Sequence, residues 1–88
     1  MVTEVEDAMG EERSLEQRQK HIEQALASSQ NSLKQYQRSY RSGLATILEL
    51  LLVEQNTYNL ETELQNIIYL RLSNRVTLGL ALGLGVSV

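Results

Sequence analysis

The 88-residue chain contains no cysteine, no proline, no tryptophan and no phenylalanine. The lack of cysteine excludes disulfides and thiolate metal sites. The lack of proline and the aromatic content of 5%, beside many Leu, Gln, Glu and Ser residues, favour helices over sheets. A net charge of −3 lacks the basic footprint of a nucleic-acid-binding protein. The composition therefore predicts a small all-α protein with no nucleic-acid partner.

Long apolar runs are absent as well. Runs such as Leu50 to Val53 are far shorter than the roughly 20 apolar residues that a membrane-spanning helix needs. The acidic N-terminus, residues 1–7, lacks the apolar core of a signal peptide. We therefore expect a soluble chain that does not itself span a membrane. Because the helical pattern starts at once, we also expect the chain to be a fragment of a longer protein.

A seven-residue repeat runs from Val5 to Tyr40 and predicts a first helical arm over residues 1–42. Its positions alternate three and four residues apart, which places them on one seam of a helix that packs against a partner. One half of the seam holds Val5, Glu12, Gln19, Leu26, Leu33 and Tyr40, and the other half holds Ala8, Leu15, Ile22, Ser29 and Tyr36. The polar members predict a loose seam.

A second helical arm is predicted over residues 47–78. Its seam holds Leu50, Val53, Thr57, Leu60, Leu64 and Ile67, with Arg71 and Asn74 following. A second apolar strip holds Leu48, Leu51, Leu52, Tyr58, Ile68, Tyr69, Leu72 and Val76. Two strips exceed what a two-helix hairpin can cover, so we expect further helices, or other copies of the chain, to pack against the second strip.

The stretch between the arms, residues 43–46, predicts a tight turn. Gly43 can adopt the left-handed conformation that closes a helix end, and Leu44 follows where such closures place an apolar contact. Thr46 and Glu49 have the spacing of a capping box, in which each residue binds the backbone of the other. We therefore predict two long antiparallel helices that form a coiled-coil hairpin with a tight glycine-containing turn. The three glycines in residues 79–88 predict a flexible or loosely packed tail.

The two arms carry opposite charges near the turn. The end of the first arm is basic and the start of the second is acidic: Lys34, Arg38 and Arg41 against Glu49, Glu54, Glu61 and Glu63. Each set complements the dipole of its own helix end, and antiparallel helices place the two sets face to face. Exposed ion pairs contribute only about 0–1 kcal/mol each, so we expect them to set the register more than the stability.

No catalytic or metal-binding constellation is present in the sequence. His21 is the only histidine, no cysteine can pair with it, and its place beside Ile22 predicts a solvated residue on the helix face. No set of His, Asp or Glu residues has metal-ligand spacing. We therefore expect no enzyme activity, no metal and no cofactor. Glu49 has two interpretations: the carboxylate of a capping box, or an acidic group near a pore mouth that biases which ions pass.

The turn and its flanks resemble a known family. Residues 40–51, followed by Glu54 and Gln55, are similar to the Y-R-x-G-x-x-x-x-x-[DE]-V-L-x-A-Q stretch of outer membrane efflux proteins, the TolC-like outer membrane factors. Residues 5–8 and 12–15 resemble the helix that precedes this stretch, and residues 74–83 resemble the N-R-V-x-L-x-x-A-L-G-G end of the family. The resemblance covers nearly the whole chain, in the right order and with the right spacing.

The resemblance implies the C-terminal periplasmic hairpin of an export channel that serves tripartite efflux or type I secretion. Family members are homotrimers in the outer membrane of Gram-negative bacteria, and their long helices form a tunnel through the periplasm. By this resemblance the turn is the periplasmic tip, and it docks an adaptor (membrane fusion) protein and, through it, an inner-membrane transporter. The docking residues are then Tyr40, Arg41, Ser42, Gly43, Leu44, Ala45 and Thr46.

The resemblance also makes Glu49 a member of an acidic ring at the tunnel entrance. Leu52 and Ala45 stand where some relatives have charged residues, so the similarity does not extend to a full charged gate. Small residues at the turn agree with docking, because a second helical tip can approach closely only where side chains are small.

A second class of function fits the same pattern: a stand-alone coiled-coil interaction module that binds a partner helix along its arms. The two hypotheses differ in where the function lies, at the turn for the channel segment and along the arms for the module. The hairpin of an adaptor protein itself is a weaker third interpretation, because such hairpins lead into β-domains and this chain ends in a Leu- and Gly-rich tail.

Overall fold

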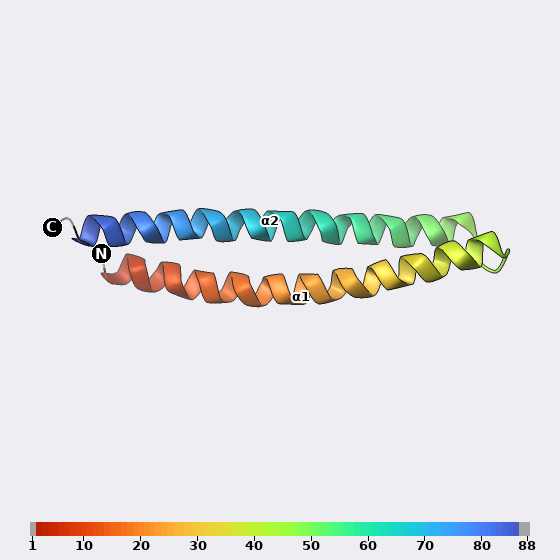
Figure 1. Cartoon of the computed structure of the whole chain (residues 1–88), viewed down its shortest axis with the longest axis horizontal. Coiled ribbons are helices and arrows are strands. Elements are labelled where there is room, and N and C mark those ends of the chain that lie inside the picture. The colour runs from red at the N-terminus through yellow and green to blue at the C-terminus, as the bar shows by residue number, and fades with distance from the viewer. Residues whose placement is uncertain (1, 87–88) are drawn as a thin grey trace. The chain divides into compact units, whose positions relative to one another are not determined.

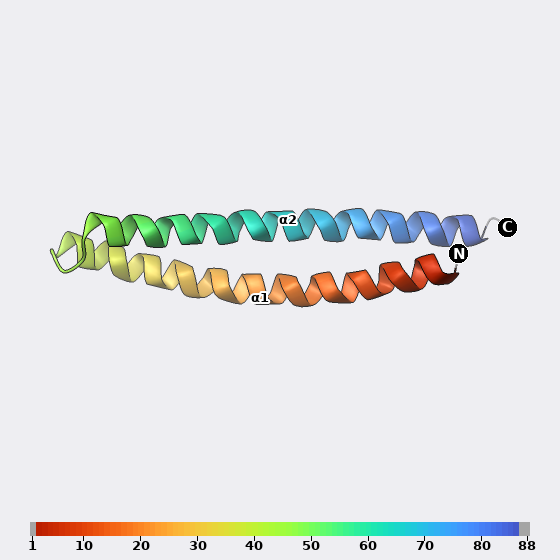
Figure 2. The same cartoon turned by 180° about the vertical axis from the view of Figure 1, so that it is seen from behind.

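The computed structural model describes residues 2–86, and these residues form two helices, α1 (Val2–Arg41) and α2 (Ile47–Val86). The two helices pack against each other in antiparallel directions (Figures 1 and 2). The predicted all-α helical hairpin is therefore confirmed. The chain divides into two compact units: unit 1 combines Met1–Lys20 with Gln65–Val88, and unit 2 comprises His21–Leu64.

In unit 1 the seam of α1 packs against the seam of α2. Leu15 and Ile67 are the most deeply buried side chains, each only 1% exposed, and Ala8 and Ala81 are also buried. Ala8, Leu15 and Ile67 occupy predicted seam positions, so the repeat identifies the buried face there, whereas Ala81 lies in the segment that was predicted to be a tail. The apolar core of the unit is small, and polar side chains occupy the seam between these residues.

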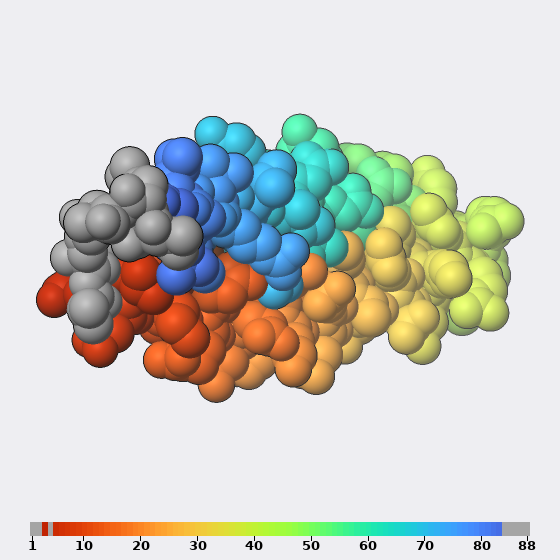
Figure 3. Space-filling view, turned by 60° about the vertical axis from the view of Figure 1, so that its left-hand side comes forward, coloured from red at the N-terminus to blue at the C-terminus, as the bar shows by residue number. Residues whose placement is uncertain are grey.

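In unit 2 the two helices meet beside the turn. Leu50 is buried at the start of α2, and the side chains of Ser29 and Thr57 are buried in the same seam. Side chains of α1 and α2 interlock in the space-filling view, so they fill the gap between the ribbons (Figure 3). Tyr40 was expected in the seam but is 43% exposed. The reason is that α2 begins only at Ile47, so little of α2 lies opposite the last turn of α1.

The second apolar strip of α2 is exposed, as the sequence predicts. Every member of the strip is a large hydrophobic residue with about half or more of its surface open to solvent: Leu48, Leu51, Leu52, Tyr58, Ile68, Tyr69, Leu72 and Val76. A helix that is apolar well beyond the face it buries usually packs against more than one neighbour. None of the helical segments in residues 2–86 combines the length and the apolar character required to cross a membrane.

The C-terminal part of α2 departs from the prediction. The helix was expected to end at residue 78, before a flexible or loosely packed tail, but it continues through Gly79 and Gly83 to Val86. Glycine lowers helix propensity by about 1 kcal/mol but, unlike proline, keeps the backbone donor of the helical ladder. Burial of Ala81 on the seam also favours the extended helix. Residues 87–88 of the expected tail lie outside the described residues.

Candidate functional site

Four backbone hydrogen bonds close the C-terminus of α1 at the turn, donated by the N–H groups of Ser42, Gly43, Leu44 and Ala45. Gly43 has a φ angle of +79°, the only positive φ among the described residues. Its N–H donates to the carbonyl of Tyr40 at 3.1 Å, and the N–H of Leu44 donates to the carbonyl of Ser39 at 2.7 Å. These two bonds define a Schellman motif, in which the left-handed residue lets the chain reverse while the last carbonyls stay paired. The predicted role of Gly43 is therefore confirmed.

A capping box begins α2 directly after the turn. The N–H of Glu49 donates to the Thr46 hydroxyl at 3.1 Å, and the N–H of Thr46 donates to the Glu49 carboxylate at 3.3 Å. The Thr46 hydroxyl also donates to the same carboxylate oxygen, Oε1, at 3.0 Å. The capping interpretation of Glu49 is confirmed, and its Oε1 atom faces its own helix end.

Two further residues of the turn are held by the end of α1. The Ser42 hydroxyl lies within hydrogen-bonding distance of the carbonyls of Arg38 (3.1 Å) and Ser39 (3.2 Å). The Arg41 Nε donates to the Gln37 carbonyl at 3.3 Å, one helical turn earlier. Every predicted docking residue thus lies on one short segment whose backbone is fixed at both ends.

Leu44 contradicts the expectation that it packs back onto α1. Its side chain is 84% exposed, the most exposed large hydrophobic residue in the described part of the chain. The physical reason is local, because the Schellman contact partner of Leu44 is Ser39, which has no apolar surface to offer. Leu44 is one of the residues that line an open hollow beside the turn, which are Gln35, Tyr36, Ser39, Leu44, Ala45 and Glu49.

A substitution pair tests the backbone of the turn. Replacing Gly43 with alanine should lower the free energy of unfolding by about 1 kcal/mol, because an L-residue is strained in the left-handed region. No atom lies within 4 Å of a Cβ built at Gly43, so the cost comes from the backbone alone. The matched control is Gly10→Ala inside α1, which should raise stability by up to about 1 kcal/mol. Thermal melts that move in the same direction for both variants would contradict this account.

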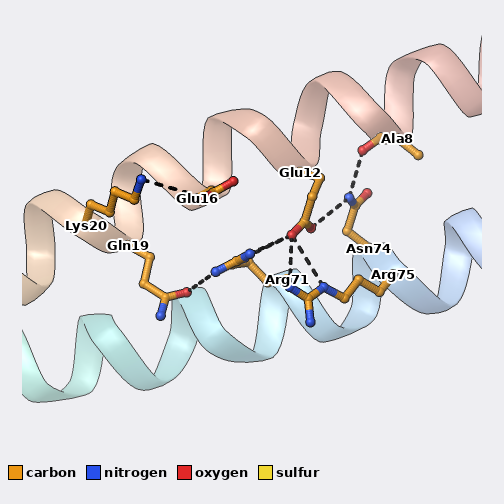
Figure 4. A network of polar contacts seen from close by, with 8 residues as sticks. All are labelled: Ala8, Glu12, Glu16, Gln19, Lys20, Arg71, Asn74 and Arg75. Carbon is orange, nitrogen blue, oxygen red and sulfur yellow. Dashed lines mark hydrogen bonds and ion pairs between the residues drawn. The ribbon is translucent and has the colours of Figure 1, made fainter.

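A second polar cluster lies in the seam of unit 1, around the carboxylate of Glu12 (Figure 4). Arg71 donates to Glu12 Oε1 from Nη2 at 2.8 Å and from Nε at 3.1 Å, and its Nη1 donates to Gln19 Oε1 at 2.8 Å. Asn74 donates to the carbonyl of Ala8 at 2.8 Å and is 3.5 Å from Glu12 Oε2. Arg75 reaches Glu12 Oε1 with longer bonds of 3.3 and 3.4 Å.

The polar residues that loosen the α1 seam are therefore matched by polar residues of α2. The heptad pattern marks Glu12 and Gln19 only as polar positions of the first seam, and Arg71 and Asn74 only as residues that continue the second seam. The distance of each residue from the turn supplies this pairing, because in an antiparallel helix pair residues at similar separations from Gly43 on either side face each other. The polar residues of the two seams thus pair with each other, with Glu12 of α1 forming an ion pair with Arg71 of α2.

The fold favours the charged form of Glu12. Hydrogen bonds from Arg71 are the main cause of a pKa below the ordinary value of 4.5, and they outweigh the partial burial that raises this pKa. Because the pKa is lower in the folded than in the unfolded chain, this contribution to stability is present above pH 4.5 and is lost as the pH falls through the lowered pKa.

Acidification is accordingly expected to destabilise the hairpin in part through Glu12. The free energy of unfolding is measured in urea for the native chain and for Glu12→Gln, each from about pH 7 to about pH 3. The difference between the two pH profiles gives the contribution of Glu12. The native chain should lose more stability than the variant across the acidic range. Equal pH dependence in both proteins would show that Glu12 is not coupled to folding.

A chain of hydroxyl hydrogen bonds crosses the seam of unit 2. The Ser29 and Thr57 hydroxyl oxygens are 2.6 Å apart, and the Thr57 hydroxyl donates to the carbonyl of Val53 at 2.8 Å. Asn56 Nδ2 donates to the Ser29 hydroxyl at 3.1 Å. Since the Thr57 proton is used on Val53, Ser29 is the donor to Thr57, and all buried polar atoms of the pair are satisfied.

The expected charge pairing near the turn does not form. Arg38 and Arg41 donate to carbonyls of their own helix, and within residues 2–86 no ion pair joins the basic set of α1 to the acidic set at the start of α2. An exposed ion pair contributes too little free energy to offset the entropy lost when two long side chains are held in one geometry.

His21 is exposed, as expected. In the described part of the chain, no group of three or more potential ligands is placed to hold a metal ion.

Scans of the chain against protein-family models, curated proteins and solved structures return no match.

Proposed function

We propose that the chain is a tip-bearing helical hairpin of an outer-membrane export channel of the TolC-like type, and that its turn docks a periplasmic adaptor protein. The observation that carries the proposal is Leu44, a large apolar side chain that is 84% exposed on a turn whose backbone is closed by hydrogen bonds at both ends. A fixed, exposed apolar residue at a helical tip is a suitable anchor for another protein.

The shape of the turn supports docking by a second helical tip. Gly43 and Ala45 flank Leu44, so little side-chain bulk surrounds the anchor, and space for a Cβ at Gly43 is open. The hollow that Leu44 helps to line also includes Tyr36, Ser39 and Glu49, so it offers both apolar surface and hydrogen-bonding groups. An adaptor hairpin tip with one apolar residue and a few backbone polar groups fits such a surface.

Within this proposal the chain acts passively. Its helices contribute to a tunnel wall in a homotrimeric parent protein in the outer membrane of a Gram-negative bacterium, on the periplasmic side. The inner-membrane transporter, reached through the adaptor, supplies the energy. Glu49 contributes a negative charge at the tunnel entrance with the carboxylate oxygen that the capping box leaves over, and so one residue serves both the cap and the entrance.

The exposed strip of α2 favours a second candidate, a coiled-coil module that binds a partner along its arms. Tyr58, Tyr69 and Leu72 are each more than half exposed and lie at least twelve residues beyond the turn in sequence. In the channel hypothesis this surface packs against further helices of the parent, whereas in the module hypothesis it is the binding site itself.

Site-directed disulfide cross-linking distinguishes the two hypotheses. The native chain has no cysteine, so single cysteines at Leu44 and at the exposed mid-arm residue Gln30 are unique probes. Each variant is produced in the periplasm together with an adaptor protein that carries a cysteine at its hairpin tip. We expect an adduct at Leu44→Cys and none at Gln30→Cys. Adducts at Gln30→Cys alone, or at neither residue, would overturn docking through the turn.

A further inference from the structure

An open groove lies between the two helices of unit 1. Its lining residues come from both helices: Asp7, Ala8 and Glu11 of α1, and Asn74, Thr77, Leu80 and Ala81 of α2. Residues 74–81 cover about two helical turns, so the groove extends along α2 for roughly 10 Å. Its volume is about 610 Å³, compared with about 320 Å³ for the hollow beside the turn. This surface is called the acidic groove.

Two alanines are the most buried residues of the acidic groove. Ala8 of α1 is 6% exposed and Ala81 of α2 is 8% exposed. The side-chain amide of Asn74 donates to the carbonyl of Ala8 at 2.8 Å and so joins the two helices within the groove. Because alanine side chains are short, a third helix can approach the pair closely. Because the pair is already joined, the surface exists before a partner binds.

Leu80 gives the acidic groove a large apolar side chain. It is 64% exposed and is not a member of the second apolar strip of α2. The proposed function assigns that strip to further helices, so the acidic groove is a separate surface. An exposed apolar residue beside buried alanines provides an anchor for an apolar side chain of a partner.

The neutral polar residues of the acidic groove have already used their hydrogen-bond donors. The Thr77 hydroxyl donates to the carbonyl of Ser73 at 3.1 Å, within α2. The Asn74 amide donates to the carbonyl of Ala8 and is 3.5 Å from Glu12 Oε2. Oxygen lone pairs are therefore what these side chains can still offer. A partner that binds here has to supply the donors.

Two carboxylates add negative charge to these acceptors. Asp7 and Glu11 are exposed, lie one helical turn apart on α1, and form no ion pair within residues 2–86. Like charges at this spacing destabilise a helix. The helix dipole favours acidic residues only in the first turn, and both residues lie beyond the first turn of α1, which begins at Val2. A cationic partner would replace this repulsion with attraction.

We propose that the acidic groove binds a basic amphipathic helix from outside this chain. Lys or Arg residues one turn apart on that helix pair with Asp7 and Glu11, which have the same spacing. An apolar side chain beside them packs against Leu80 and the two alanines. This is the helix-in-groove form of recognition, with charge complementarity to set the specificity. The inference concerns unit 1 and does not rest on the proposed function of the turn.

Other occupants fit the acidic groove less well. The same carboxylates repel nucleic acid and anionic lipid surfaces. In the described part of the chain no group of three or more potential ligands is placed to hold a metal ion. A small-molecule site encloses most of its ligand, whereas a groove that is open to one side suits a helix that lies along it.

Binding of two synthetic peptides tests the proposal. Both form amphipathic helices with the same leucines, and the polar face carries lysines in one and glutamates in the other. Fluorescence anisotropy with the full chain should show binding of the lysine peptide and at least about tenfold weaker binding of the glutamate peptide. No binding of the lysine peptide, or equal binding of both, overturns the proposal. Displacement of the lysine peptide by free lysine amide would assign the groove to a small cation and also overturns it.

Paired charge variants locate the site. Asp7→Asn combined with Glu11→Gln should weaken binding of the lysine peptide by about tenfold. Glu61→Gln combined with Glu63→Gln removes the same charge from exposed residues that do not line the groove, and should leave binding unchanged. Equal weakening by the two double variants would mean that only the net charge of the chain matters, and the groove would then not be the site.

A pair of leucine variants tests the apolar contact. Leu80→Ala should weaken binding of the lysine peptide by about fivefold. Leu82→Ala is the same change at a residue of α2 that is 49% exposed but does not line the groove, and it should have no effect. Equal effects of both changes contradict the assigned anchor.

The folding of the variants is checked separately from binding. Because the substituted residues are exposed, each variant should keep the helical circular dichroism spectrum of the native chain. The variant that removes both Asp7 and Glu11 charges should melt at an equal or higher temperature, since it removes a like-charge pair. The peptide experiments concern unit 1 and the cross-linking at Leu44 concerns unit 2, so either proposal can fail without the other.

Discussion

Replacing Arg71 with leucine is expected to lower the free energy of unfolding by about 2 kcal/mol. The substitution removes three hydrogen bonds, two to Glu12 and one to Gln19, and leaves a carboxylate in the seam with only its weaker partners. The Glu12 and Arg71 side chains are each about one-fifth exposed, so the expected cost lies below that of breaking a fully buried pair. Urea unfolding at neutral pH measures the effect.

A double variant and a control variant test whether the loss of stability comes from the partly buried ion pair. The double variant Glu12→Leu with Arg71→Leu should recover most of the loss, because an apolar pair fills a seam about as well as a partly buried ion pair does. Lys20→Leu breaks the exposed pair with Glu16 and should change stability by less than about 0.5 kcal/mol. If the Arg71 and Lys20 variants unfold at the same urea concentration, the cluster around Glu12 does not hold the helices together.

Replacing Ile67 with alanine should cost about 3 kcal/mol. Ile67 and Leu15 are the two fully buried large side chains among the described residues. Because the apolar core is so small, few other side chains can move to fill the cavity that alanine leaves. The effect is large for a small domain, whose total stability is typically about 5–15 kcal/mol. Thermal and urea unfolding should both report the loss.

The neighbouring residue provides the control. Ile68→Ala is the same substitution one position along α2, but Ile68 is 49% exposed and faces away from the seam. At a concentration low enough for the chain to be monomeric, this change should cost less than about 0.5 kcal/mol. Similar losses for both variants would mean that the packing of the heptad seam does not set the stability of the hairpin.

The buried face and the turn could be predicted because both depend on local chemistry. Heptad spacing identifies Leu15 and Ile67 without knowledge of their partners, since the period of a helix alone puts them on one side. The capping box of Thr46 and Glu49 and the left-handed Gly43 involve residues within a few positions of each other. For the same reason the sequence could show that α2 has more apolar surface than one partner covers.

The contacts between α1 and α2 could not be predicted from periodicity. Heptad spacing shows which face of a helix is buried but not which residues of the other helix lie opposite. The match of Glu12 with Arg71 depends on the register, which follows only when the position of the turn is combined with antiparallel packing. The exposure of Leu44 depends on what lies opposite it, and there the sequence offers only Ser39. The helix beyond residue 78 could not be predicted, because glycine has low helix propensity and the burial of Ala81 depends on packing against α1.

The self-contained turn has a consequence for the order in which the hairpin folds. Its hydrogen bonds join residues no more than six positions apart, so it can form before any distant part of the chain is ordered. Each seam pair further from the turn then closes only a small additional loop, and the arms zip together from the turn outward. We expect the transition state to contain a formed turn, while the contacts of Ala8 and Ala81 form after it. Substitutions at Gly43 then slow folding, whereas those near the open end mainly speed unfolding.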